Sequence, residues 1–333
     1  MANDTLTAIK GLRVGHAAVQ GSPSGCTVVL PEGGATAGVD IRGGAPGTYG
    51  TDVLHPVNLV DRMHGLFFTG GSAFGLGVAE GVVRYLSERG TGFDTGHGLV
   101  PIVGGAVIFD LGANPAGRRP DGALGYQACL AASTDPVPEG CTGAGLGATV
   151  GKLYGLTRAM KGGLGSSCIE TSNGIRAGAL MVVNAFGDIV DPERGQIVAG
   201  CRTAPQSLEF ADAERELAGL TRLDGFPEGR ATLVGTVATN VRLNKAQLTK
   251  VAQMAQDGIA RAVYPAHTMY DGDTIFALSC GDREGVDVSV VGALAARAVA
   301  QAILRGVRKA VAAAGFPAFA DREATFGGRS PGG

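Results

Sequence analysis

The stretch that decides the fold opens with Glu228-Gly-Arg-Ala-Thr232 and runs on to Leu278. An apolar run follows the threonine and ends at Thr239-Asn240, and a helix-like segment comes next. The stretch closes with His267-Thr-Met-Tyr-Asp271-Gly-Asp273 and the apolar residues Thr-Ile-Phe-Ala-Leu278. A threonine therefore stands where a polar loop becomes a buried strand. Two carboxylates flank a glycine where a second such strand begins.

Thr232 is a candidate nucleophile. A threonine hydroxyl reacts poorly at neutral pH unless a base takes its proton, and the residue's own α-amine, with a pKa of roughly 8, suits that task. The amine would appear only after the Ala231–Thr232 bond breaks, through attack of the hydroxyl on the carbonyl of Ala231. A small residue before the bond, a polar linker over 202–230 and an apolar strand after the bond fit this scheme. The alternative is an ordinary threonine at a strand start, since strands favour β-branched residues.

The pair Asp271 and Asp273 is the second candidate. Carboxylates on either side of a glycine at a strand edge could orient a threonine hydroxyl and stabilise a charged amine. Like charges this close also push their pKa values apart, which separates acid and base roles. Two other interpretations stay open at this point: a metal-binding Asp-x-Asp, as in sugar-nucleotide transferases, and a polar turn before a strand.

Asn184 and Lys152 are the remaining candidates. Asn184 ends an apolar run, so its amide could project into a pocket and donate to an oxyanion. Lys152 follows the glycine-rich segment 143–151, which resembles a phosphate-binding loop but has leucine where that loop needs its first glycine and its Ser/Thr. The five histidines show no paired metal spacing, and His267 near the acidic pair fits a capping or packing role.

Composition narrows the class of protein. With 333 residues, of which 45% are hydrophobic, the chain can build a sizeable core. A net charge of -2 and only 17% charged residues argue against nucleic acid as a partner. Six scattered cysteines without a C-x-x-C indicate reduced thiols in a cytoplasmic protein. We expect no signal peptide and no membrane span, and the 56 glycines predict many tight turns.

Periodicity predicts strands and helices that do not alternate one for one. A hairpin is expected over 26–40, where two short strands flank Pro-Glu-Gly-Gly. Helices are expected over 73–88 with Ser72 as N-cap, 121–132, 245–263 with Asn244 as N-cap, and 288–314. Strands that arrive in pairs and are followed by long helices favour an α+β layered sandwich over a doubly wound parallel sheet. The last seven residues, 327–333, are expected to be disordered.

Taken together, these signals give a resemblance to a known family. The chain resembles the self-processing aminopeptidases and amidases that include the D-aminopeptidase/esterase DmpA, the β-aminopeptidases and the nylon-oligomer hydrolases. The match covers roughly residues 11–314. The segments that carry it are Val39-Asp-Ile-Arg-Gly-Gly-Ala-Pro-Gly-Thr48, Thr69-Gly-Gly-Ser-Ala-Phe-Gly75, Pro101-Ile-Val-Gly-Gly-Ala-Val-Ile-Phe-Asp110, Ala148-Thr-Val-Gly-Lys152, Thr232–Asn240 and Pro265-Ala-His-Thr-Met-Tyr-Asp-Gly-Asp-Thr-Ile-Phe-Ala277.

The resemblance implies a fold and a processing event. It implies an αββα layered sandwich of the DmpA and ornithine acetyltransferase type, with 1–333 as a single catalytic domain. The precursor would be cut into an α chain, 1–231, and a β chain, 232–333. Relatives of this kind form multimers of αβ units, so a homotetramer of processed protomers is expected.

The resemblance also implies roles for the candidate residues. Thr232 matches the nucleophile, Asp271 and Asp273 match the pair around a glycine, Asn184 matches the oxyanion-hole asparagine, and Lys152 matches a pocket lysine. Two departures stand out. Ala231 replaces the Asn or Gly often found before the scissile bond, and Phe109 stands where some relatives carry tyrosine.

The expected function is hydrolysis of amide bonds in short peptides, β-peptides, small amides or polyamide oligomers, with no metal or organic cofactor. Three alternatives remain open. An acyl transferase related to ornithine acetyltransferase would use the same threonine. A glycine-rich oligomeric binding protein would never process, and a glycosyltransferase would need a metal at the acidic pair.

Overall fold

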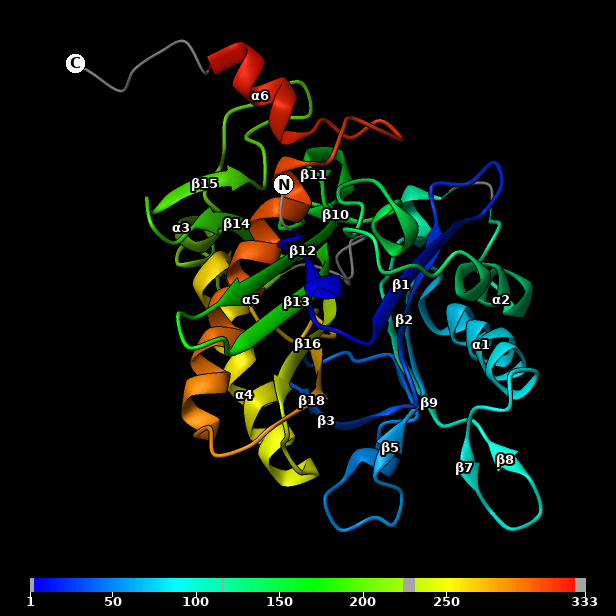
Figure 1. Cartoon of the computed structure of the whole chain (residues 1–333). Coiled ribbons are helices and arrows are strands. Elements are labelled where there is room, and N and C mark those ends of the chain that lie inside the picture. The colour runs from blue at the N-terminus through cyan, green and yellow to red at the C-terminus, as the bar shows by residue number, and fades with distance from the viewer. Residues whose placement is uncertain (1–2, 115–116, 224–230, 327–333) are drawn as a thin grey trace.

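The computed structural model describes residues 3–114, 117–223 and 231–326. Two β-sheets pack face to face, and a pair of helices covers the outer side of each sheet (Figure 1). Helices α1 and α2 cover the first sheet, and α4 and α5 cover the second. The αββα sandwich predicted from the sequence is therefore present, and both sheets mix parallel and antiparallel pairs.

The first sheet has five strands in the order β1-β2-β6-β9-β4. Its only parallel pair among the described residues is β6 with β9. The bounds are β1 Leu12–Ala18, β2 Gly25–Pro31, β4 Thr48–Tyr49, β6 Gly65–Thr69 and β9 Val103–Val107.

The second sheet has six strands in the order β12-β13-β16-β18-β3-β5. Its central strands, β16 and β18, run parallel and carry the two ends of the deciding stretch. The bounds are β3 Ala35–Ile41, β5 Arg62–Met63, β12 Gly163–Glu170, β13 Arg176–Asn184, β16 Thr232–Val241 and β18 Thr274–Arg283.

The long helices have clear sequence signals at their starts. Asn244 and Gln247 form a capping box in which each side chain bonds the other's backbone N–H, as expected for an N-cap with glutamine three residues later. Asp121 and Asp287 cap α2 and α5 in the same position. The bounds are α1 Val78–Ser87, α2 Gly122–Leu130, α3 Ala213–Leu217, α4 Lys245–Ala262, α5 Val288–Arg308 and α6 Phe319–Phe326.

Helix α5 is the one helix in the described residues that is long and apolar enough to cross a membrane. It packs instead against β12, β13 and α4, and 67% of its most apolar window is buried. A core helix of a folded domain explains this composition fully.

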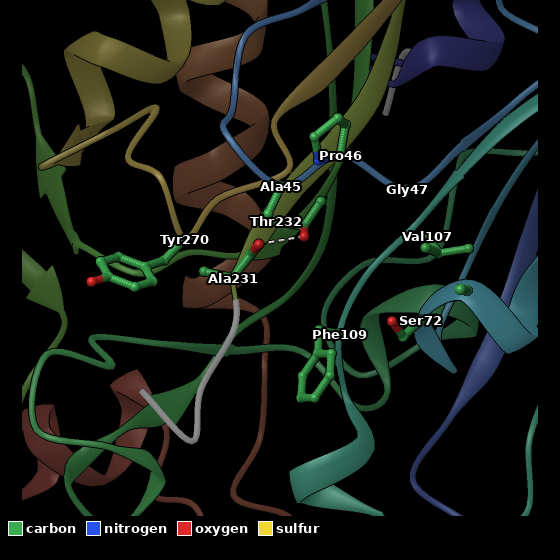
Figure 2. Close-up of a pocket in the computed structure, with 10 residues that line it drawn as sticks. Ala45, Pro46, Gly47, Ser72, Val107, Phe109, Ala231, Thr232 and Tyr270 are labelled. Atoms are coloured by element: carbon green, nitrogen blue, oxygen red, sulfur yellow. Dashed lines mark hydrogen bonds between the residues drawn. The ribbon is translucent and has the colours of Figure 1, made fainter. Parts of the chain in front are cut away.

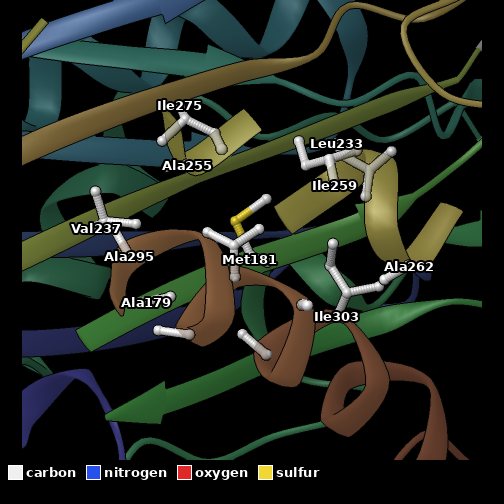
Figure 3. Close-up of a cluster of buried hydrophobic side chains, with 14 of the residues drawn as sticks. Ala179, Met181, Leu233, Val237, Ala255, Ile259, Ala262, Ile275, Ala295 and Ile303 are labelled. Carbon is white, nitrogen blue, oxygen red and sulfur yellow. The ribbon is translucent and has the colours of Figure 1, made fainter. Parts of the chain in front are cut away.

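Two hydrophobic layers hold the sandwich together. Between the sheets, Phe68 of β6 and Phe276 of β18 meet with ring centroids 6.1 Å apart, and both are fully buried. Outside the second sheet, side chains of β13, β16 and β18 pack against the inner faces of α4 and α5 (Figure 3). Met181, Leu233 and Ile303 lie in this outer layer.

Short elements decorate the sandwich. They comprise three small sheets and six 3-10 turns in the described residues. The bounds are β7 Phe93–Asp94 with β8 Leu99–Val100, β10 Thr149–Val150 with β11 Met160–Lys161, β15 Gln196–Ala199 with β14 Asp188–Asp191 and β17 Val263–Tyr264, and the turns Leu6–Ala8, Asp52–Leu54, Ser72–Gly77, Leu111–Ala113, Gly143–Gly145 and Leu156–Arg158.

The helix expected over 288–314 ends at Arg308, and two other local predictions were wrong. The segment 26–40 is not a hairpin, because β2 pairs with β1 and β6 in the first sheet while β3 pairs with β18 and β5 in the second. Ser72 is not a helix cap. Its backbone is left-handed, with φ of 53°, and a 3-10 turn separates it from α1. The polar linker is described as far as 223, and its residues 224–230 and the tail 327–333 lie outside the described residues.

Candidate active site

Three neighbouring strands bring the predicted residues together. β16 begins at Thr232, which pairs with Asn184 at the end of β13. On its other side β16 runs parallel to β18, and Val234 pairs with Thr274. Asp273 is the residue directly before Thr274. A separate parallel bridge joins Ala231 to Asp271.

Hydrogen bonds hold both peptide groups of Ala231, including the peptide bond to Thr232. The hydroxyl of Thr232 donates a hydrogen bond to the carbonyl oxygen of Ala231, the residue before it. The same oxygen accepts from the backbone N–H of Gly272 at 3.1 Å, and the N–H of Ala231 donates to the carbonyl of Tyr270 at 3.1 Å. Both residues are buried. The hydroxyl is thus held beside the carbonyl group that it would attack.

Asp273 supports the residue after Thr232. One carboxylate oxygen accepts from the backbone N–H of Leu233 at 2.8 Å. The other accepts from the backbone N–H of His267 at 3.2 Å and bonds its Nδ1 at 2.8 Å. His267 has a left-handed backbone, with φ of 58°. The backbone N–H and the side chain of His267 are therefore both bonded to Asp273.

Asp271 holds the turn before β18. Its Oδ1 accepts from the backbone N–H of Phe186 at 3.3 Å. Its Oδ2 accepts from the backbone N–H and the hydroxyl of Thr268 at 3.0 and 2.5 Å. Burial, and then the charge of Asp273, raise the pKa of Asp271 to about 7. Asp271 and Asp273 therefore bond different segments, and neither shares a donor with the other.

Asn184 and Lys152 form a buried pair beside Thr232. The ammonium of Lys152 donates to the backbone carbonyl of Asn184 at 3.0 Å and to its Oδ1 at 2.7 Å. The same Oδ1 accepts from the N–H of Thr149 at 3.0 Å, and Nδ2 donates to the carbonyl of Phe109 at 3.2 Å. Burial lowers the pKa of Lys152 to about 7, although Asp271 and Asp110 act in the opposite direction.

Asp110 is a buried carboxylate that sequence reasoning did not single out. It accepts from the hydroxyl of Ser24 at 2.6 Å and from the backbone N–H of Gly71 at 2.7 Å. Burial raises its pKa, and these bonds and the charge of Lys152 oppose the rise. Asp110 therefore fixes the turn that presents Ser72. Its position directly after Phe109, at the end of a quoted motif, was the available signal.

A cavity of about 330 Å³ opens at the Ala231–Thr232 bond (Figure 2). Its walls come from both sheets, so Thr232 of the second sheet faces the first. The lining residues are Ala45, Pro46, Gly47, Ser72, Ala73, Val107, Phe109, Ala231, Thr232 and Tyr270.

The loop between β3 and β4 needs glycine to form this wall. A Cβ on Gly43 would lie 2.4 Å from both the carbonyl oxygen of Asp271 and the backbone nitrogen of Asp273. The glycine pair 43–44 in the quoted motif therefore lets the loop lie directly on the acidic turn. Among the described residues, no group of three or more His, Cys, Asp and Glu could hold a metal ion.

Comparison with known proteins assigns the family. The model of peptidase family S58 matches residues 4–319. The chain belongs to this family. An uncharacterised aminopeptidase of Mycobacterium tuberculosis (strain ATCC 25618 / H37Rv) is 40% identical over 344 residues, which cover 96% of this chain and 97% of the relative. A 6-aminohexanoate-oligomer endohydrolase of Kocuria sp. (strain KY2) is 30% identical over 313 residues, which cover 90% and 84%.

A solved structure confirms the fold. The L-aminopeptidase D-Ala-esterase/amidase from Ochrobactrum anthropi, whose structure is described as a variant of the Ntn hydrolase fold, superposes with a TM-score of 0.67. It is 21% identical and covers 92% of this chain and 86% of its own. The family and the relatives make the chain a hydrolase of amide bonds. These proteins give no support to the acyl transferase alternative.

Proposed function

We propose that the chain is made as a precursor that cuts itself between Ala231 and Thr232, giving chains 1–231 and 232–333 of one catalytic domain. The observation that carries this proposal is the position of the Thr232 hydroxyl beside the Ala231 carbonyl, whose oxygen accepts from Gly272 N–H. That N–H would stabilise the negative charge that develops on the oxygen during attack.

The chemistry of cleavage follows from this geometry. The hydroxyl oxygen of Thr232 bonds to the carbonyl carbon of Ala231, the C–N bond breaks, and the proton of the hydroxyl goes to the departing amine. The resulting ester joins Ala231 to the Thr232 side chain. Water then hydrolyses the ester, which releases a carboxylate on Ala231 and leaves the free amine on Thr232.

In the processed enzyme, the amine of Thr232 acts as general base for its own hydroxyl. Asp273 holds the strand at Leu233, and Asp271 holds the turn that faces the nucleophile. Asn184 donates an amide N–H to the substrate oxyanion. To do so, its Nδ2 gives up the hydrogen bond that it donates to the carbonyl of Phe109 in the structure. Lys152 fixes the Asn184 side chain by bonding its Oδ1.

The substrates in this proposal are short peptides, β-peptides, small amides and linear polyamide oligomers. The names of the relatives support this range, since one is an aminopeptidase and another an oligomer endohydrolase. The mechanism calls for no metal or organic cofactor. We further propose a homotetramer of processed protomers in the cytoplasm, and the six cysteines, all free, fit a reducing compartment.

Intact-mass analysis of the purified protein tests the proposal. Wild type gives two chains whose masses sum to the precursor plus one water, and Thr232→Ala gives one uncut chain without amidase activity. Thr232→Ser is the matched control, because it keeps a hydroxyl and should still process. A wild-type protein that stays intact and hydrolyses amides fully would refute the mechanism.

A further inference from the structure

His267 is a polar residue of the acidic turn that the proposed mechanism does not use. Its backbone N–H donates to Oδ2 of Asp273 at 3.2 Å, and its ring Nδ1–H donates to the same oxygen at 2.8 Å. The carboxylate is 0% exposed and the histidine side chain only 17% exposed, so water weakens this pair little. The shorter of the two bonds comes from the side chain, which therefore has a specific task at the carboxylate.

Two unfavourable features accompany the contact between His267 and Asp273. The backbone of His267 is left-handed, with φ of 58°, and this conformation costs free energy in a residue that has a Cβ. The ring Nε2 is buried and has no hydrogen-bond partner among the described residues, whereas buried polar atoms are normally bonded. A side chain that only filled the turn would need neither feature. The pair with Asp273 is the contact that both features serve.

This contact reaches the nucleophile through the other oxygen of Asp273. That oxygen, Oδ1, accepts from the backbone N–H of Leu233 at 2.8 Å. Backbone nitrogens of neighbouring residues lie about 3.5 Å apart in an extended chain, so Oδ1 lies within about 6.5 Å of the nitrogen of Thr232. Cleavage turns this nitrogen into the free amine and removes its bond to Ala231. The orientation of Asp273 therefore affects the start of the strand and the amine that acts as base.

We propose that His267 is a positioning residue for Thr232. Its Nδ1–H fixes the orientation of the Asp273 carboxylate. The carboxylate fixes the start of β16 before cleavage and the free amine of Thr232 after it. Because His267 acts through Asp273 and touches no substrate atom, it affects the rate of reaction and not the binding of substrate. The inference rests on the proposed function, since it takes Thr232 as the nucleophile.

Three substitutions of His267 separate the side-chain donor from the shape of the turn. The amide nitrogen of asparagine is as far along the side chain as Nδ1, and asparagine tolerates a left-handed backbone. The amide nitrogen of glutamine is one bond further out and corresponds to Nε2. Glycine adopts the left-handed backbone without strain and has no donor. We expect self-cleavage of His267→Gln and His267→Gly to be at least tenfold slower than in wild type, by intact mass, and His267→Asn to recover most of the rate.

Steady-state kinetics of the processed fraction distinguish positioning from a purely structural role. The probes are alanyl-p-nitroanilide and a linear 6-aminohexanoate oligomer. In His267→Gln and His267→Gly, kcat should fall at least tenfold while KM stays within threefold of wild type. A purely structural role would reduce the amount of folded, processed protein and leave kcat of that fraction unchanged. His97→Gly, which replaces an exposed histidine outside the site, is the control and should match wild type.

The outcomes keep the two proposals apart. Equal cleavage rates in the asparagine, glutamine and glycine variants of His267, or an unchanged kcat in the last two, would overturn the positioning role and leave Thr232 as the nucleophile. A wild-type protein that stays uncut yet hydrolyses the probes would overturn the proposed function instead.

Discussion

The backbone N–H of Gly272 lies 3.1 Å from the carbonyl oxygen of Ala231 and donates a hydrogen bond to it. This contact places a donor from the acidic turn on the carbonyl that the Thr232 hydroxyl faces. The two aspartates hold the turn through other bonds, so the donor itself is a backbone group between them. The acidic pair and the Ala231–Thr232 bond are thus joined through Gly272.

Replacing this glycine should slow self-cleavage. In Gly272→Ala the new Cβ would lie 2.6 Å from the carbonyl oxygen of Ala45 and 3.1 Å from the Thr232 hydroxyl, so the turn must move. We expect processing to slow by at least tenfold, measured by intact mass at intervals after synthesis. Gly77→Ala is the control, because its Cβ meets nothing within 4 Å, and equal processing of both variants would contradict the proposed donor.

Asp273→Asn should also slow processing. An amide offers one acceptor oxygen where the carboxylate offers two, so either Leu233 or His267 loses its partner. A buried unsatisfied donor costs about 1–3 kcal/mol, and the start of β16 would shift to relieve it. Cleavage should be at least tenfold slower by the same mass assay. Asp282→Asn, on the exposed part of β18, should process at the normal rate.

Lys152 and Asn184 should be energetically coupled. Asn184→Leu removes the oxygen that binds the Lys152 ammonium at 2.7 Å and leaves a buried charge poorly bonded, which costs about 3 kcal/mol. Adding Lys152→Met should restore part of that loss. The free energies of unfolding of both single variants and the double variant, measured by urea in a Thr232→Ala background, should give a coupling of about 1–3 kcal/mol. Additive losses would contradict the coupling.

Much of the fold could be predicted from local patterns. The capping signal at Asn244 and the apolar face of the following segment gave α4 within one residue at its end. The segment 26–40 failed because a turn signal reports only on its own residues. Whether β2 pairs with β3 or with β1 and β6 depends on contacts with distant strands. The α+β sandwich was confirmed because it needs only the order of the elements.

The grouping of the candidate residues was predictable where side-chain patterns gave a signal. Thr232, Asn184 and Asp273 have side chains whose spacing gave a signal, and β13, β16 and β18 bring them together. Gly272 acts through its backbone, so nothing in its side chain could reveal the donor. Ser72 was misread as a cap because serine is a common cap, whereas its left-handed backbone results from the surrounding turn.

The buried ammonium of Lys152 predicts how stability changes with pH. An exposed lysine has a pKa of 10.5, and burial lowers that of Lys152 to about 7. Below pH 7 both the folded and the unfolded chain hold the proton, so the cost of burying the charge is constant. Between pH 7 and 10.5 the unfolded chain keeps the proton and the folded chain has released it, so stability rises with pH. The raised pKa of Asp271 acts at lower pH, below about 7.

Urea unfolding at pH 7, 8 and 9 measures this effect. The free energy of unfolding of Thr232→Ala should rise by about 1 kcal/mol per pH unit relative to that of the double variant Thr232→Ala with Lys152→Met. Comparing the two proteins cancels the titration of cysteines and tyrosines, which they share. Parallel curves would mean that Lys152 keeps its proton throughout this range in the folded protein.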